Sequence, residues 1–148
     1  MSSSLLVEYE RLVSVEFGAV YFGNWPLDAR HDAPHMFPGH EPPGVAFTGT
    51  GVGVYSDCYD DELMQLDIRF YESDPHCEGV KIGSVGGEFF VSSDRLAPAT
   101  VNLAPVDPLD PPFRGNVGVR VTHVDLGKND DPAVRDKWNI DIWPILLK

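Results

Sequence analysis

The 148 residues suit one domain, and a chain of this length can bury a full hydrophobic core. With 43% hydrophobic residues and no apolar run near the roughly 20 residues of a membrane helix, the composition excludes a disordered or membrane-spanning chain. The net charge of −12 at pH 7 opposes binding to a nucleic-acid backbone and favours a basic protein partner.

The N-terminal residues point to a cytoplasmic protein. They lack the basic segment of a signal peptide, and their apolar run stops at Glu8. In that reducing compartment we expect Cys58 and Cys77 to be free thiols rather than a disulfide.

The first third of the chain predicts short strands around one long loop. Leu5 to Phe22 predicts one or two strands, with the earlier, more charged half at a sheet edge. Leu27 to Gly44 contains four prolines and predicts a loop, and a loop this long is often functional. Val45 to Phe47 and Gly51 to Tyr55 predict two strands around a glycine-rich turn.

The middle of the chain predicts four further strands. Gln65 to Glu72 alternates apolar and polar residues, as a half-buried strand does. Gly86-Gly87 predicts a tight hairpin turn between strands at Val80 to Val85 and Glu88 to Ser92. Ala99 to Ala104 predicts one more strand.

The clearest strand pattern lies near the C-terminus. Asn116 to Asp125 and Lys137 to Leu147 alternate with period two around a polar spacer, which predicts a long-looped antiparallel pair. Asp131 to Asp136 offers the best chance of one helical turn, because proline suits the first helical position.

These elements together predict an all-β fold, a single-domain antiparallel β-sandwich of about eight strands over residues 1–148. The predicted core residues are Leu66, Ile68, Phe70, Val117, Val119, Val121, Trp138, Ile140 and Ile142.

Three histidines in the proline-rich loop, His31, His35 and His40, form the most metal-like pattern, since zinc prefers imidazole and thiolate ligands. Their spacing fits no standard motif, so incidental histidines in a solvated loop are the simpler interpretation. A metal-binding protein or metal-dependent enzyme that uses this loop stays an alternative. No nucleophile elbow surrounds a serine or cysteine, and we predict no catalytic residue and no cofactor.

Acidic residues and tyrosines gather between Tyr55 and Glu78, and Arg69 is the only arginine or lysine in this stretch. Tyrosine supplies contact area at low entropic cost, so this stretch is a candidate docking face for a basic protein. The predicted partner-binding residues are Tyr55, Asp57, Tyr59, Asp60, Asp61, Glu62, Asp67, Tyr71 and Glu72. The competing interpretation is an ordinary charged sheet edge whose acids keep the chain soluble.

The closing residues also resemble a known family. Gly115 to Val121 and the later Trp143-Pro144 are similar to the final strands of the competence protein J (Nin) group of β-rich bacterial proteins. Founding members of that group inhibit a nuclease. The resemblance therefore implies an acidic, non-enzymatic immunity protein or inhibitor that occludes a basic toxin or nuclease. A structural subunit of a larger assembly is a further alternative, and the sequence predicts no oligomeric state.

Overall fold

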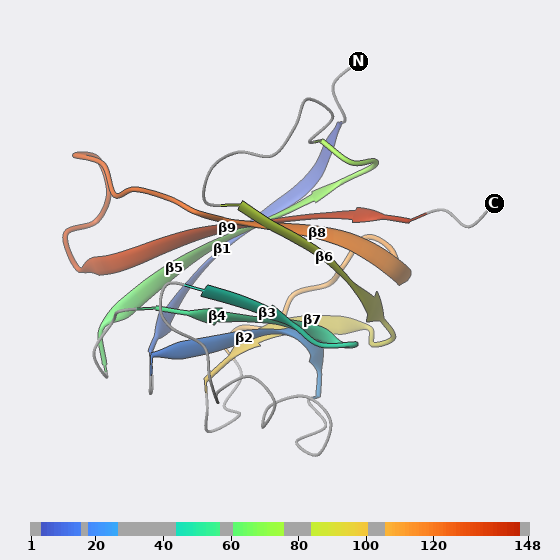
Figure 1. Ribbon diagram of the computed structural model, residues 1–148, viewed down its shortest axis with the longest axis horizontal. Coiled ribbons are helices and arrows are strands. Elements are labelled where there is room, and N and C mark those ends of the chain that lie inside the picture. The colour runs from blue at the N-terminus through green and yellow to red at the C-terminus, as the bar shows by residue number, and fades with distance from the viewer. Residues whose placement is uncertain are drawn as a thin grey trace.

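The computed structural model describes residues 4–15, 18–26, 44–56, 61–75, 84–100 and 106–145. These residues form nine strands in two sheets that lie one above the other (Figure 1). The described residues form no helix, and so none that could cross a membrane. The strands are β1 (Leu5–Ser14), β2 (Ala19–Trp25), β3 (Gly44–Phe47), β4 (Gly51–Tyr55), β5 (Leu63–Tyr71), β6 (Ser84–Val91), β7 (Arg95–Ala99), β8 (Gly115–His123) and β9 (Val134–Pro144). The prediction of an all-β sandwich is confirmed.

The larger sheet has the order β1-β5-β9-β8-β6. The expected antiparallel pair at the C-terminal end is present as β8 and β9, with Val119 opposite Ile142. One pairing departs from the antiparallel pattern, because β5 and β9 run parallel with Ile68 beside Ile140. No hairpin joins these two strands, so alternation within each strand could not reveal their relative direction.

The smaller sheet has the order β3-β4-β2-β7, and all of its pairings are antiparallel. Gly23 of β2 lies opposite Gly51 of β4, and the Tyr21 ring lies over both. A Cβ on Gly51 would come within 2.4 Å of the Tyr21 hydroxyl and of the Phe22 carbonyl oxygen. Glycine at this site therefore lets an aromatic ring and a neighbouring backbone approach closely.

The core lies between the two sheets and is built from the inward residues of both. All nine predicted core residues belong to it, and each is at most 2% exposed. The stretch from Leu5 to Phe22, which was predicted to hold one or two strands, forms two strands that lie in different sheets. Val13 of β1 and Val20 of β2 face the core, whereas Tyr21 packs on the other side of its sheet.

The hairpin predicted at Gly86-Gly87 is wrong, because β6 continues straight through both glycines. The Phe47 ring of the other sheet explains Gly87, since a Cβ there would come within 2.6 Å of that ring. Two glycines in a row can therefore mark either a turn or a place where a strand must let a ring approach.

The predicted helical turn at Asp131 to Asp136 is also wrong. The Val134 N–H donates to the Asp131 carbonyl at 2.9 Å, and the Ala133 N–H donates to the Asp131 side chain at 2.9 Å. These bonds close a single turn, after which β9 begins at once. The strand expected at Ala99 to Ala104 falls mostly on residues 101–105, which lie outside the described residues, and Ala99 is the last residue of β7. Gly44 begins β3, and the remainder of the proline-rich loop, residues 27–43, also lies outside them.

Candidate protein-binding face

The outer face of the five-stranded sheet carries a row of alternating charge. Glu8, Arg69, Asp141 and Arg120 are successive cross-strand neighbours on β1, β5, β9 and β8. Nε of Arg69 lies 3.3 Å from Oδ1 of Asp141, which is an ion pair without the alignment of a good hydrogen bond. Asp141 is only 5% exposed, so this pairing compensates a carboxylate that solvent barely reaches.

The row ends at a hollow of about 610 Å³ over β6, β8 and the end of β9. Gly86 lies opposite Arg120, and a Cβ on it would come within 3.2 Å of the guanidinium Nη2. Gly118 lies opposite Trp143 and leaves the same kind of room for the indole ring, whose atoms would lie 2.4–2.7 Å from a Cβ. The two glycines thus let an arginine and a tryptophan lie flat against the sheet.

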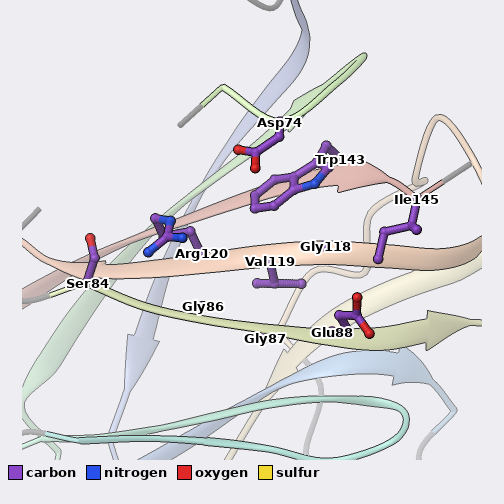
Figure 2. A pocket seen from close by; sticks show the side chains of 10 residues that line it. All are labelled: Asp74, Ser84, Gly86, Gly87, Glu88, Gly118, Val119, Arg120, Trp143 and Ile145. Carbon is purple, nitrogen blue, oxygen red and sulfur yellow. The ribbon is translucent and has the colours of Figure 1, made fainter. Parts of the chain in front are cut away.

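The hollow combines both signs of charge with an aromatic surface. Figure 2 shows Arg120, Trp143 and Asp74 on one side of β8, while Val119 points to the other side. Glu88 lines the hollow from β6, and both it and Asp74 are exposed. Nε of Arg120 is buried, and no described residue gives it a hydrogen-bond acceptor. The guanidinium of Arg120 also lines the hollow, where its N–H groups can donate to an oxygen ligand from outside the chain.

A second charged group joins Lys137 of β9 to Asp67 of β5 and to Asp130 in the loop before β9. Nζ of Lys137 lies 3.0 Å from Oδ1 of Asp130 and 3.8 Å from Oδ2 of Asp67. The hydrogen bond that Lys137 donates to Asp130 is the largest cause that raises the pKa of Lys137. The Gly127 N–H, which donates to Asp130 at 2.6 Å, is the largest cause that lowers the pKa of Asp130, followed by Lys137.

Replacing Asp130 with asparagine is expected to lower stability in a pH-dependent way. The folded pKa of Asp130 lies below its unfolded pKa, so the carboxylate stabilises the fold above the unfolded value. That contribution is lost as the pH falls through the folded pKa. The free energy of unfolding of Asp130→Asn should therefore be lower than that of the wild type near pH 6, and the difference should shrink as the pH falls below the ordinary aspartate pKa of about 4. Urea denaturation across that range measures it, and a difference that stays constant with pH would contradict this account.

The structure places the predicted binding residues in different regions. Asp67 and Tyr71 lie on β5 and alternate with its core residues, so they face outward, and Glu72 follows them. Burial is the main cause that raises the pKa of Tyr71, and the Asp141 carboxylate adds to it. Gln65 holds Asp67 in place through a hydrogen bond of 2.9 Å.

The remaining predicted residues lie elsewhere. Asp61 and Glu62 form the turn before β5, where Nε of Arg135 lies 3.0 Å from Oε2 of Glu62. Tyr55 packs with Tyr21 on the outer side of the other sheet and is 5% exposed, and burial raises its pKa to about 12. Asp57, Tyr59 and Asp60 lie outside the described residues. The structure therefore brings Asp67, Tyr71 and Glu72 together and sets Tyr55 apart from them.

The metal and cysteine alternatives concern other parts of the chain. His31, His35, His40, Cys58 and Cys77 all lie outside the described residues. Within the described ranges, no three or more histidine, cysteine, aspartate or glutamate side chains are arranged to hold a metal ion.

A polar cluster around the buried Asp136 was not predicted. Asp136 accepts hydrogen bonds from the Ser56 hydroxyl at 2.5 Å and from the Trp138 indole at 2.9 Å, and its other oxygen lies 2.5 Å from Nε2 of His123. The His123 ring stacks on Trp138 with centroids 4.3 Å apart. Asp136 of β9 thus joins His123 of β8 to Ser56, which directly follows β4. The sequence held a signal for this cluster, because Asp136 shares its strand face with Trp138 and Ile140.

The hollow was also missed at the sequence level. Gly86 and Gly118 were its only signal, because glycine inside a strand often marks a close approach by another group. That signal does not say which residue approaches, so Arg120 and Trp143 could not be chosen from the pattern.

Comparison with known proteins gives a likeness in structure. No family model and no curated protein sequence matches the chain. The solved structure of ComJ from Bacillus subtilis, an inhibitor of the DNA-degrading activity of NucA, is similar with a TM-score of 0.61 and 13% identity. That likeness covers 98% of this chain and 100% of ComJ. A protein described as crocagin biosynthetic gene J is similar with a TM-score of 0.51 and 14% identity over 97% of this chain and 99% of that protein. The resemblance to the competence protein J group is thus confirmed for the fold.

Proposed function

We propose that this chain is a non-enzymatic, acidic inhibitor of a nuclease, which acts by covering a basic surface of that enzyme. The observation that carries the proposal is the likeness to ComJ, which extends over essentially the whole of both chains. ComJ inhibits the DNA-degrading activity of NucA. The shared fold is the starting point, and the charge of this chain adds an independent physical reason.

The net charge decides which component of a nuclease reaction the chain can bind. DNA is a dense polyanion, and a chain with a net charge of −12 is repelled by it. The surface of a nuclease that holds DNA must be basic, and such a surface attracts an acidic protein and accelerates their encounter. An inhibitor of this composition therefore acts on the enzyme rather than on its substrate.

The outer face of the five-stranded sheet is the surface that we propose for this contact. Asp74 and Glu88 are exposed there and line the hollow with Trp143, and Tyr71 lies on the same face of the sheet. Acidic groups would steer the basic partner, and the two rings would supply contact area at low entropic cost. The ion pair of Arg69 and Asp141 beneath them holds the centre of the face in one arrangement.

The expected result is that the purified chain abolishes DNA degradation by a nuclease of its source organism at about one inhibitor per enzyme. The assay titrates the chain into DNA-degrading fractions of a cell extract and of the culture medium, and follows the cleavage of linear duplex DNA. Inhibition should set in more slowly at high salt, because the Debye length falls from about 10 Å at 0.1 M to about 3 Å at 1 M. If the chain leaves every DNA-degrading fraction fully active at low salt, the proposed function is wrong.

A further inference from the structure

The edge of β6 is the feature from which a new inference follows. β6 is the last strand of its sheet, so one of its sides faces β8 and the other faces away. The Phe90 N–H donates to the Gly49 carbonyl at 3.0 Å, and the Phe90 carbonyl accepts from Nδ2 of Asn24 at 2.7 Å. Both partners lie outside this sheet, so the backbone groups of Phe90 point away from β8. Because this direction alternates along an antiparallel strand, the groups of Ser84, Gly86 and Glu88 also point away from β8.

The other strand edges in the described part of the chain are protected. Folded proteins protect an edge with charge, proline, short length or a covering segment, because open backbone groups recruit another strand. On β1, Glu8 and Glu10 supply the charge. β7 contains Pro98, whose carbonyl accepts from the Val106 N–H at 2.9 Å. Leu96 of β7 and Leu109 also exchange two backbone hydrogen bonds, so the segment from Val106 to Leu109 covers this edge. β3 has only four residues.

Among the described residues, none protects the first half of β6 in these ways. Gly86 and Glu88 are exposed, and Glu88 is the only charged residue of the strand. Two apolar side chains of the strand are also open to solvent, Val85 at 41% and Phe90 at 47%. Exposed apolar side chains and little charge are the properties of an edge that accepts another strand.

We propose that an extended, basic segment of the inhibited nuclease pairs with Ser84 to Glu88 and becomes a sixth strand of this sheet. This inference rests on the proposed function, and it identifies where and in what form the partner is held. Backbone hydrogen bonds to Ser84, Gly86 and Glu88 would supply affinity, and side chains of the added strand would supply specificity.

The hollow beside β6 defines the chemistry of the added strand. Residues of that strand on the outer face would lie next to Gly86 and Glu88, with Arg120 and Trp143 on the opposite side of β6. A lysine or arginine beside Glu88 would meet its carboxylate, with the Trp143 ring within the same hollow. Gly86 has no side chain, so an oxygen-bearing side chain beside it could reach Arg120. We therefore expect a basic residue and an oxygen-bearing residue two positions apart in the segment.

Charge distinguishes this occupant from a second copy of the same chain. Two copies that pair through β6 would each carry a net charge of −12 and would repel each other. A basic segment is attracted over the same surface. Self-pairing is the outcome that would show the choice of occupant to be wrong.

The test replaces Gly86 with proline. Its N–H points away from β8, so proline removes a donor from the open edge and leaves the β6–β8 pairing intact. A Cβ at this position meets only the flexible end of Arg120, at 3.2 Å. The inhibition constant against the nuclease identified above should rise about tenfold or more, because the ring also blocks an approaching strand. Far-UV circular dichroism and the thermal midpoint of the variant establish that it is folded.

Two matched controls separate the edge from general effects. Leu12 lies on the edge strand β1, and its N–H points away from β5 because the Val15 N–H, three residues on, points toward it. Leu12→Pro should leave inhibition unchanged. Glu88→Lys should weaken inhibition more than Asp125→Lys, which makes the same change in net charge in an exposed loop. Equal effects within either pair of variants would overturn the assignment to β6.

Hydrogen exchange on the wild type gives a readout that needs no variant. The amides of Ser84, Gly86 and Glu88 should exchange more slowly once the nuclease is added, whereas that of Leu12 should not change. Unchanged exchange at β6 during full inhibition would overturn the inference and leave the proposed function standing. A chain that inhibits no nuclease fails both. If the chain alone forms dimers that Gly86→Pro dissociates, the occupant is a second copy, and the proposal of a basic segment is wrong.

Discussion

Replacing Ile140 with alanine is expected to lower the free energy of unfolding by about 2–5 kcal/mol. Ile140 is 0% exposed and lies in the middle of β9. Its neighbours on either side are Ile68 of β5 and Val121 of β8, both fully buried. The change removes three carbons where backbone ladders on both sides hold the walls of the cavity apart, so the site can collapse only partly.

Urea denaturation at neutral pH measures this loss, provided that the slope of the transition stays the same as in the wild type. Leu12→Ala is the matched control, because Leu12 is 42% exposed on β1 and its truncation should change the free energy by about 0.5 kcal/mol or less. A loss at Ile140 no larger than that at Leu12 would mean that β9 is not the centre of the sheet.

Replacing Asp136 with alanine is the second large effect that we expect. Its carboxylate accepts from the Trp138 indole at 2.9 Å and from the Lys137 backbone N–H at 3.1 Å, and it also holds Ser56 and His123. A buried donor that loses its acceptor costs about 1–3 kcal/mol. The Trp138 indole and the Ser56 hydroxyl are two such buried donors, so we expect a loss of about 2–6 kcal/mol in the free energy of unfolding.

Asp136→Asn should lose less, because its amide oxygen still accepts one of these hydrogen bonds. Asp125→Ala removes the same charge from an exposed position and should change stability little. Urea denaturation gives the free energies of unfolding, and near-ultraviolet circular dichroism reports whether Trp138 has lost its fixed packing. If Asp136→Ala is as stable as Asp125→Ala, the buried cluster does not contribute to the stability of the sandwich.

Alternation within single strands predicted the core correctly. Ile140, Ile142 and Val119 face inward because side chains on a strand alternate with period two, and this property is local. The order and direction of strands are not local properties. β5 lies parallel to β9 because of how distant segments pack, and nothing within either strand encodes that neighbour.

The roles of the strand glycines and the grouping of the site residues were harder to predict, because they too depend on contacts between segments that are distant in sequence. Gly87 was assigned to a turn because the ring that requires it, Phe47, belongs to the other sheet. Tyr55 and Tyr71 were grouped by their closeness in sequence, yet they lie on different sheets. The hollow depends on Arg120 and Trp143, which become neighbours only when β8 and β9 pair.

The position of β9 has a consequence for the order in which the protein assembles. β9 separates the pair β1–β5 from the pair β8–β6, so it joins two otherwise independent parts of one sheet (Figure 1). While the chain emerges from the ribosome, β1 and β5 can pair early. The apolar face and the open side of β5 stay uncovered until β9 and other later residues have been synthesised. Contacts this distant in sequence slow folding, because a long loop must close before they form. During synthesis the open side of β5 is therefore the edge most exposed to pairing with the wrong strand, and the arrival of β9 closes it.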